Sequence, residues 1–322
     1  MKRKKILVTG GAGFIGSHVN KMLYKSGYET VVLDNLQTGT KEAVVQGELI
    51  EGDIGDNALL DQIFSQGSID AVMHFAALIN VGESVEKPDI YYENNVVKTL
   101  CLLNAMRRHG VMSFVFSSSA AVFGVPKTIP LDESHPANPI NPYGKTKLMV
   151  EQILQDYDRA YGLRFAALRY FNAAGGDPEG IVKNKAVKQH NLIPMGLKSL
   201  LQGSPLTIFG TDYPTKDGTC VRDYIHIDDL GAAHILALKR IIATQKSGYY
   251  NLGNGQGYTV REVIESIERV TGLKLTVIEG VRRAGDPEAL VADSRLAENE
   301  LGWKRQFQSL DKIVADAWGA LR

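Results

Sequence analysis

Residues 6–16 read ILVTGGAGFIG and place Gly10, Gly13 and Gly16 at three-residue intervals directly after a short apolar run. The apolar run predicts a buried strand, and the residues from Phe14 onward predict a helix. Glycine at such a junction permits a tight turn, close approach of the backbone to a pyrophosphate, and close packing of helix on sheet. The start of the helix then offers free N–H groups to phosphates. This stretch therefore predicts a dinucleotide-binding strand–loop–helix unit.

An acidic residue follows this unit at a characteristic distance. The next strand-like run ends at Asp34, 18 residues after Gly16. A carboxylate there accepts hydrogen bonds from the adenine ribose hydroxyls and repels a 2′-phosphate, so NAD is favoured over NADP. A third strand-like stretch ends in Gly52, Asp53 and Ile54, at a place suited to cover the adenine.

Strand and helix patterns alternate along the first half of the chain. Strands are predicted at 6–8, 30–33, 71–75, 114–116 and 165–168, and helices at 15–26, 58–65 and 90–109. Such alternation implies βαβ units with right-handed crossovers. We therefore predict an α/β fold with a Rossmann-type, doubly wound parallel sheet.

The sequence pattern changes after about residue 175. Residues 176–190 are polar and predict a surface loop, followed by a strand at 206–209 and helices near 228–242 and 260–271. We predict an NAD-binding domain at 1–175 and a smaller mixed α/β domain at 176–322. The second domain would supply the other wall of a substrate cleft, with some chain crossing back to the sheet.

The composition excludes several classes of protein. The 322 residues carry 36 Lys and Arg against 36 Asp and Glu, which argues against a nucleic-acid binder. The cysteines, Cys101 and Cys220, are too few for a disulfide framework and lack metal-ligand spacing, so no metal is expected. No apolar run approaches a membrane span. We expect a cytoplasmic protein without nucleic-acid or membrane partners.

A second group of polar residues indicates the chemistry. Tyr143 and Lys147 lie four residues apart, on one face of a helix that starts near Pro142. Tyrosine titrates near pH 10, too high for a base at neutral pH. A neighbouring ammonium and a positively charged nicotinamide would both favour the phenolate and lower that pKa. Upstream, residues 117–119 are three serines at the end of a strand, and one of them could hold a substrate oxygen. Together with the dinucleotide loop, these residues indicate dehydrogenase-type chemistry.

These motifs resemble the extended short-chain dehydrogenase/reductases. The resemblance rests on the glycine loop, Asp34, the serine run and the Tyr–Lys pair, and it extends from about residue 6 to 318. Further motifs are HFAA at 74–77, VGES at 81–84, YYENN at 91–95, LRYFN at 168–172, FGTDYPT at 209–215 and VRDYIH at 221–226. The chain is most similar to the UDP-glucose 4-epimerase family.

The resemblance implies a mechanism and roles for three residues. Tyr143 would remove the proton from the sugar 4-hydroxyl while C4 gives hydride to NAD; the 4-keto sugar would then turn and take hydride back on its other face. Lys147 would bind the nicotinamide ribose and tune Tyr143, and Ser119 matches the catalytic serine. NAD is thus a recycled cofactor, and a UDP-hexose is the substrate.

The resemblance also implies the remaining site residues. Those matching cofactor-binding positions are Gly10, Gly13, Phe14, Ile15, Gly16, Asp34, Asn35, Asp53, Ile54, Phe75, Ala76, Asn94, Tyr143, Lys147 and Tyr170. Those matching substrate-binding positions are Ser119, Phe171, Asn172, Asn191, Phe209, Arg222, Arg283, Asp286 and Leu290. Relatives dimerise through two long helices per subunit, here 90–109 and the helix after Tyr143, so a homodimer is expected.

Several positions depart from the family pattern and leave substrate breadth open. Ile79 stands at a frequent lysine position, Ala121 at a threonine and Phe123 at a tyrosine, and 176–190 is shorter and more basic than in relatives. Leu290 lies where bulky tyrosine excludes N-acetylated sugars. Epimerisation of a UDP-N-acetylhexosamine, UDP-pentose or UDP-hexuronate is therefore an alternative. A 4,6-dehydratase or decarboxylase would need acid or base groups where two alanines stand, and a non-catalytic NAD-binding regulator would not need Tyr143, Lys147 and Ser119.

Overall fold

The computed structural model describes residues 3–182, 191–283 and 286–322. Its largest sheet has seven strands in the order β3-β2-β1-β4-β5-β6-β10, and every neighbouring pair is parallel. The strands are β1 (Lys5–Thr9), β2 (Glu29–Asp34), β3 (Glu48–Glu51), β4 (Ala71–His74), β5 (Ser113–Ser119), β6 (Arg164–Tyr170) and β10 (Gly248–Leu252). The order reverses between β1 and β4, as in Rossmann folds, which confirms the predicted fold class.

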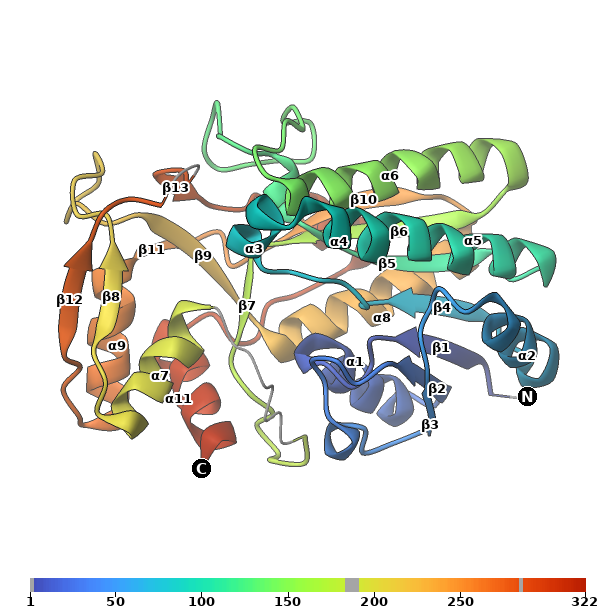
Figure 1. The fold of residues 1–322 in the computed structure, drawn as a ribbon, viewed down its shortest axis with the longest axis horizontal. Coiled ribbons are helices and arrows are strands. Elements are labelled where there is room, and N and C mark those ends of the chain that lie inside the picture. The colour runs from blue at the N-terminus through green and yellow to red at the C-terminus, as the bar shows by residue number, and fades with distance from the viewer. Residues whose placement is uncertain (1–2, 183–190, 284–285) are drawn as a thin grey trace.

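Helices cover both faces of this sheet (Figure 1). One face packs against α1 (Phe14–Lys25) and α8 (Ile227–Thr244), with α10 (Arg295–Leu301) beside them. The other face packs against α2 (Asn57–Gly67), α5 (Lys98–Arg108) and α6 (Pro142–Tyr161). The two apolar cores lie on opposite sides of the strands, whose middle residues are mostly apolar and buried, as expected for a parallel sheet covered on both faces.

The helix predicted at 90–109 has an irregular middle. It consists of α4 (Pro88–Tyr92), a π-helical turn at Glu93–Val97, and α5, in one continuous run. In the turn, the amide of Asn95 reaches away from the helix to both backbone groups of Leu78, at 2.9 Å each, and to Thr146. Apolar periodicity does not reveal such a turn, because it depends on contacts with distant segments.

The C-terminal lobe, at the left of Figure 1, has a core of its own. It comprises α7 (Leu192–Gln202), α9 (Val260–Thr271), α11 (Leu310–Leu321) and the parallel pair β8 (Leu206–Phe209) and β12 (Val277–Gly280). A capping box, in which Thr259 and Glu262 bond reciprocally to backbone N–H groups, starts α9. The predicted strand at 206–209 and helix at 260–271 are confirmed, as is the helix at 228–242 within α8.

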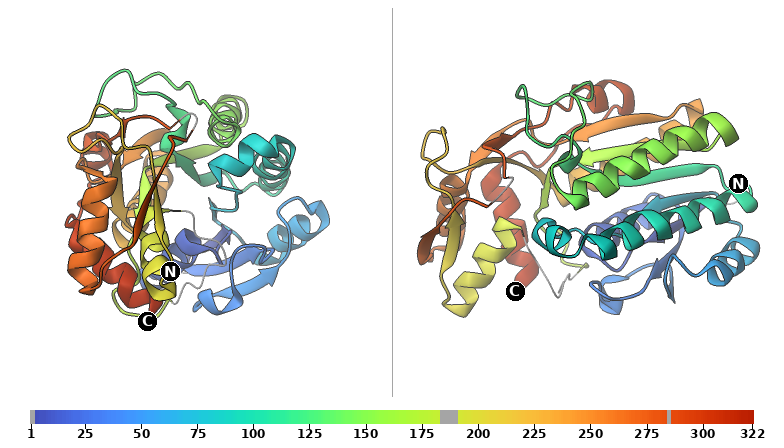
Figure 2. Two further views of the ribbon diagram at one scale, coloured as in Figure 1. Left: turned by 60° about the vertical axis from the view of Figure 1, so that its left-hand side comes forward. Right: turned by 45° about the horizontal axis from the view of Figure 1, so that its top comes forward.

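A smaller sheet connects the lobe to the large sheet. Its central strand β9 (Val221–His226) pairs with β7 (Asn172–Ala174), β11 (Gly257–Thr259) and β13 (Ala289–Leu290). The buried carboxylate of Asp223 accepts three backbone N–H bonds, from Asn254, Gly255 and Ala292, and so ties β9 to two chain segments. Figure 2 shows this sheet running between the two parts.

Two expectations about the chain's organisation meet the structure only in part. Residues 176–182 form no helix or strand. The rest of the predicted loop, residues 183–190, lies outside the described residues. Two elements after residue 175 belong to the large sheet: β10 is its outer strand, and α8 packs on one of its faces. A domain boundary at 175 stays a prediction.

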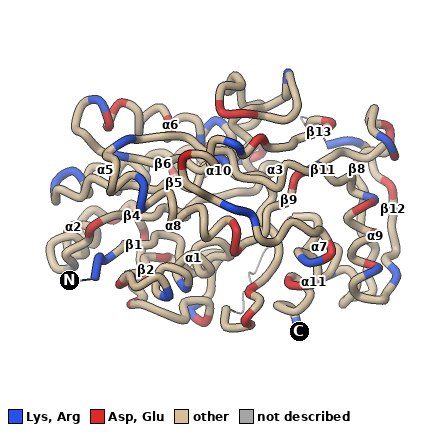
Figure 3. Tube along the Cα trace, turned by 180° about the vertical axis from the view of Figure 1, so that it is seen from behind, with Lys and Arg blue, Asp and Glu red and all other residues tan. Residues whose placement is uncertain are grey.

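Charged residues of both signs are interspersed over the molecule (Figure 3). Within the described ranges, no helix combines the length and the apolar character that crossing a bilayer demands.

Candidate active site

A cavity of about 540 Å³ lies at the carboxyl ends of β1, β2, β4, β5 and β6. On its other side it is walled by residues of β7, β9 and β13 and by the segment that enters α7. Ligands of open α/β sheets bind outside the carboxyl ends of the strands, where the strand order reverses. The cavity thus lies where the fold favours a binding site.

The glycine loop has a backbone that side chains would disrupt. Gly10 has a φ of +72°, and a Cβ there would collide with the backbone of Ala76. A Cβ on Gly16 would collide with the carbonyl oxygen of Gly10, so the first turn of α1 packs directly on the loop. Gly13 is the N-cap of α1 and offers no side chain to its free N–H groups. The resulting cradle of backbone donors fits a pyrophosphate.

Two carboxylates stand beside this cradle. Asp34 accepts hydrogen bonds from the N–H groups of Ala12 and Leu36, at 2.9 and 2.8 Å, which fixes it at the end of β2. Asp53 accepts from Lys98 at 2.7 Å and from Gly55 at 2.8 Å. Burial favours the protonated form of Asp53, but these bonds outweigh it and hold its pKa below the usual value. Both side chains line the cavity, and their oxygens are suited to accept hydroxyl hydrogens.

The three serines of β5 have different partners. Ser117 is hydrogen-bonded to the Tyr170 hydroxyl, while Ser118 donates to Glu151 at 2.6 Å. The Ser119 hydroxyl accepts from the Ala121 N–H at 3.2 Å and is within hydrogen-bonding reach of Tyr143. Because side chains alternate along a strand, Ser117 and Ser119 face the cavity and Ser118 points away from it.

Tyr143 and Lys147 project from the first turns of α6, whose N-cap Asn141 bonds to the Gly144 N–H at 2.8 Å. Tyr143 lines the cavity. The Lys147 ammonium is buried, donates to the Ser117 carbonyl oxygen at 2.7 Å and lies 5.9 Å from the centre of the Tyr143 ring. The pair is thus held between α6 and β5.

Burial dominates the protonation of both groups. It raises the pKa of Tyr143, against the opposing effect of the Ser119 hydrogen bond. Burial likewise lowers the pKa of Lys147 to about 7, against the favourable charge of Glu151. The sequence predicted a tyrosine pKa lowered by an ammonium and a cationic nicotinamide together. In the protein alone the pKa of Tyr143 is raised, because desolvation outweighs the Ser119 hydrogen bond.

The far end of the cavity carries positive charge and aromatic surface. The Arg222 guanidinium is ion-paired with Asp286 and also donates to the Val221 carbonyl at 2.8 Å. Arg283 lies over the Phe209 ring, 3.9 Å from its centre, just outside the lining. Arg222 and Asp286 line the cavity, so a guanidinium is available there to an anionic ligand.

The middle of the cavity is lined by residues from the connecting sheet and from the start of α7. Asn172 donates to the Asp223 carbonyl at 2.9 Å, and Asn191 is the N-cap of α7 without a side-chain cap bond of its own. Leu290 packs in the small apolar cluster that contains Phe171 and the fully buried Phe123. The Phe123 ring contacts the His135 ring edge-on, and it carries no hydroxyl that would need a hydrogen-bond partner.

Most residues that the resemblance assigned to a site line this one cavity. They are Gly10, Gly13, Phe14, Ile15, Gly16, Asp34, Asn35, Asp53, Ile54, Phe75, Ala76, Asn94, Ser119, Tyr143, Tyr170, Phe171, Asn172, Asn191, Arg222, Asp286 and Leu290. Lys147, Phe209 and Arg283 lie behind or beside the lining. Their assigned roles, like those of the others, stay predictions.

Among the lining residues that the sequence did not assign to the site, two form a hydrogen-bonded pair. The Tyr91 hydroxyl donates to Glu83 at 3.1 Å, and both side chains line the cavity. Both lie in motifs noted in the sequence, but spacing alone does not show that α3 (Val81–Glu86) and α4 bring them together.

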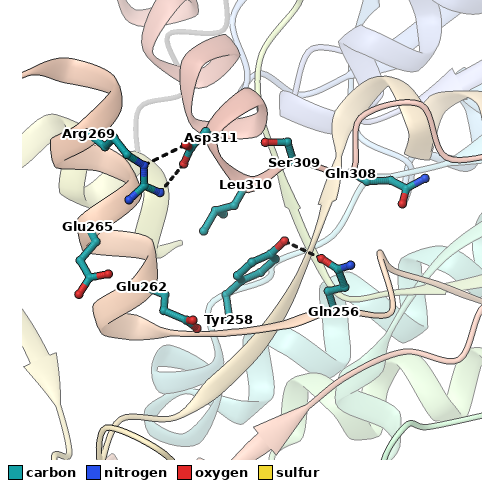
Figure 4. A pocket seen from close by; sticks show the side chains of 9 residues that line it. All are labelled: Gln256, Tyr258, Glu262, Glu265, Arg269, Gln308, Ser309, Leu310 and Asp311. Atoms are coloured by element: carbon teal, nitrogen blue, oxygen red, sulfur yellow. Dashed lines mark hydrogen bonds and ion pairs between the residues drawn. The ribbon is translucent and has the colours of Figure 1, made fainter.

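A second hollow, of about 480 Å³, lies in the C-terminal lobe between α9 and α11 (Figure 4). Arg269 and Asp311 form an ion pair across it, and Tyr258 donates to Gln256 at 2.9 Å. None of the site residues predicted from the sequence lines it.

The fold and the cavity together define a dinucleotide-dependent enzyme of the short-chain dehydrogenase/reductase kind. A profile of the NAD dependent epimerase/dehydratase family matches residues 6–253. The UDP-glucose 4-epimerase of Lactobacillus helveticus is 49% identical over 316 residues, covering 98% of this chain and 96% of that protein. The chain therefore belongs to the NAD-dependent epimerase/dehydratase family.

Solved structures agree with this assignment. UDP-glucose 4-epimerase from Brucella ovis in complex with NAD superposes with a TM-score of 0.95 at 47% identity, covering 98% of each chain. The enzyme from Bifidobacterium longum in complex with NAD⁺ and UDP superposes with a TM-score of 0.92 at 39% identity, again over 98% of each chain.

Proposed function

We infer that this protein is an NAD-dependent epimerase that interconverts UDP-glucose and UDP-galactose. The observation that carries the inference is one continuous cavity that joins the α1 glycine loop, Tyr143 with Ser119, and Arg222. These are a pyrophosphate cradle, an acid–base group and an anion-binding group in a single space. The curated relatives of this chain, at 44–49% identity over nearly its full length, carry the same activity in their names.

The cofactor half of the cavity has the residues that NAD requires. The free N–H groups of the glycine loop would hold the pyrophosphate, and Asp34 would accept the adenine ribose hydroxyls. Lys147, buried behind Tyr143, would serve the nicotinamide ribose. When bound, NAD supplies a reversible hydride acceptor for the sugar C4.

The protein's own part in the reaction is to position the sugar and to move one proton. Tyr143 would take the proton of the 4-hydroxyl and return it after the ring has turned, with the Ser119 hydroxyl sharing that hydrogen bond. Because burial opposes ionisation of Tyr143, the phenolate needs the Lys147 ammonium and the cationic nicotinamide beside it.

The UDP part of the substrate would occupy the far end of the cavity. Arg222 would exchange its ion pair with Asp286 for the diphosphate, and Asn191 places the positive end of α7 toward the same region. Arg283 and the Phe209 ring would border the uridine.

Substrate breadth is set by the middle of the cavity. Leu290 has intermediate bulk where tyrosine would exclude N-acetylated sugars, and Ile79 gives the cofactor side an exposed apolar contact. Activity on another UDP-sugar is therefore the second candidate, to be decided by the same assay.

We also propose a homodimer formed by α4, α5 and α6. These helices lie side by side, and together with the π-helical turn between α4 and α5 they expose the apolar side chains of Ile90, Val97, Met149 and Tyr161. A second copy related by two-fold symmetry would bury this surface. The two free cysteines suit a reducing compartment, so we place the protein in the cytoplasm.

The test is to incubate the purified protein with UDP-galactose, UDP-glucose, their N-acetyl forms and UDP-pentoses, and to identify the products. Formation of UDP-glucose from UDP-galactose is expected. No reaction with any UDP-sugar would contradict the proposal, and reaction only with another UDP-sugar would favour the second candidate.

A further inference from the structure

Three polar side chains follow one another at four-residue intervals on α6. Tyr143 and Lys147 belong to the proposed reaction, and Glu151 comes one turn later on the same face. Glu151 is 2% exposed and does not line the cavity. Burial of a carboxylate is costly unless the group is paired and hydrogen-bonded.

Glu151 is held on both of its oxygens. Ser118 donates to Oε1 at 2.6 Å, and Arg169 donates from Nε to Oε1 at 3.0 Å and from Nη2 to Oε2 at 2.7 Å. The Arg169 guanidinium also lies over the rings of Phe123 and Tyr249, 5.2 and 4.7 Å from their centres. These contacts shield the charge of Glu151 from water and fix its position.

Lys147 is surrounded by groups from three strands and its own helix. From β4 comes His74, from β5 come the Ser117 carbonyl and the Phe116 ring, and α6 adds Tyr143 and Glu151. From β6, Arg169 bonds to Glu151 and Tyr170 bonds to the Ser117 hydroxyl. Burial and the charge of Lys147 lower the pKa of His74 to about 3, so this imidazole is neutral. Among these groups Glu151 supplies the negative charge.

We propose that Glu151, held by Ser118 and Arg169, is a positioning residue of the reaction that keeps Lys147 in the ammonium form. It does so through its charge, without touching substrate or cofactor. The inference rests on the proposed function, because the ammonium matters only if Tyr143 must ionise. The direction of the effect agrees with the protonation of Lys147, whose ammonium is disfavoured by burial and favoured by Glu151.

The main test compares wild type with Glu151→Gln, which keeps the shape and removes the charge. With less support for the ammonium, the basic limb of kcat against pH should move about one unit lower. At pH 7 kcat should fall about fivefold, because a shift of one unit from a pKa of about 7 lowers the ammonium fraction of Lys147 from about one half to about one tenth. Above about pH 8 the fall should approach tenfold. KM should stay within about twofold, because Glu151 lies outside the cavity.

Two further variants separate charge from structure. Glu151→Asp keeps the charge and should keep the wild-type pH profile even if its thermal stability falls. If Glu151→Gln does not fold, the double change Glu151→Gln with Arg169→Gln replaces it, because no unpaired charge then remains buried. A downward shift is still expected, but a smaller one than in the single variant, because the positive charge of Arg169 is removed as well.

Glu300→Gln is the matched control. Glu300 also accepts bonds from an arginine and a tyrosine, Arg240 and Tyr250, but lies on α10 behind the sheet. Its profile should match wild type. An unshifted profile for the Gln variants, in a protein whose wild type turns over, would overturn the inference; a wild type without turnover would instead overturn the proposed function.

Discussion

The two ends of the cavity are built in opposite ways. At the reacting end, Tyr143 and Lys147 are held on the long helix α6 and the central strand β5, and burial displaces the pKa of each from its usual value. At the far end, Arg222, Arg283 and Asp286 are partly exposed and come from short strands and connecting segments. Proton transfer needs desolvated groups in fixed positions, whereas diphosphate binding needs charges that a ligand can reach. The two tasks are thus divided between regular and irregular parts of the chain.

The largest effect is expected for Tyr143→Phe, which tests whether the reacting end of the cavity depends on this hydroxyl. Losing the acid–base group should lower kcat by about 10³-fold, while NAD remains bound and KM changes little. Steady-state kinetics and the NAD content of the purified protein measure both effects. Tyr258→Phe removes the same hydroxyl from the C-terminal lobe and should be fully active. A Tyr143→Phe enzyme with normal turnover would exclude Tyr143 as the base.

The second prediction concerns the cost of burying Lys147. Its folded pKa is about 7, while a lysine in an unfolded chain titrates near 10.4. Between these values the unfolded chain binds more protons, so the free energy of unfolding contributed by this group rises with pH. Against Lys147→Met, wild type should gain about 1 kcal/mol per pH unit between about pH 7.5 and 9.5. Urea unfolding at several pH values measures this, and a constant difference would contradict it.

At the far end, Arg222→Gln should act on binding. The variant loses a guanidinium that would face the diphosphate, so KM for the UDP-sugar should rise about ten- to a hundredfold with kcat nearly unchanged. Initial rates over a range of substrate concentrations show the split. A fall in kcat at unchanged KM would instead assign Arg222 to the reacting end.

The smallest effect is expected for an exposed ion pair of the lobe. Arg261 and Glu279 pair at 2.7 Å with both side chains in solvent. Arg261→Gln should change the free energy of unfolding by less than about 0.5 kcal/mol and leave kinetics unchanged. Urea unfolding and the standard assay check this, and a loss above about 2 kcal/mol would show that the lobe depends on its surface charges.

The features that the sequence predicted depend on local spacing, and those that it did not predict depend on packing between distant segments. The glycine loop, Asp34 and the pairing of Tyr143 with Lys147 depend on spacing within one or two elements, and the predicted strands and helices there are confirmed. The ion pair of Glu151 with Arg169 joins α6 to the strand β6, so it depends on packing that no local pattern shows. The strand β10 was missed for a similar reason, because its five residues pair only with distant β6.

The position of β10 and α8 has a consequence for how the chain is made. A ribosome that has released only residues 1–175 has produced six strands of the large sheet without its outer strand. It has also not yet produced α8, whose Leu230, Ile235 and Leu238 complete the core under α1. The sheet is therefore complete only after residue 252 has emerged, and the core on this face only after Trp303. The long delay between first and last strand exposes β6 as an unpaired edge during synthesis, which is the stage at which the nascent protein most needs protection from aggregation.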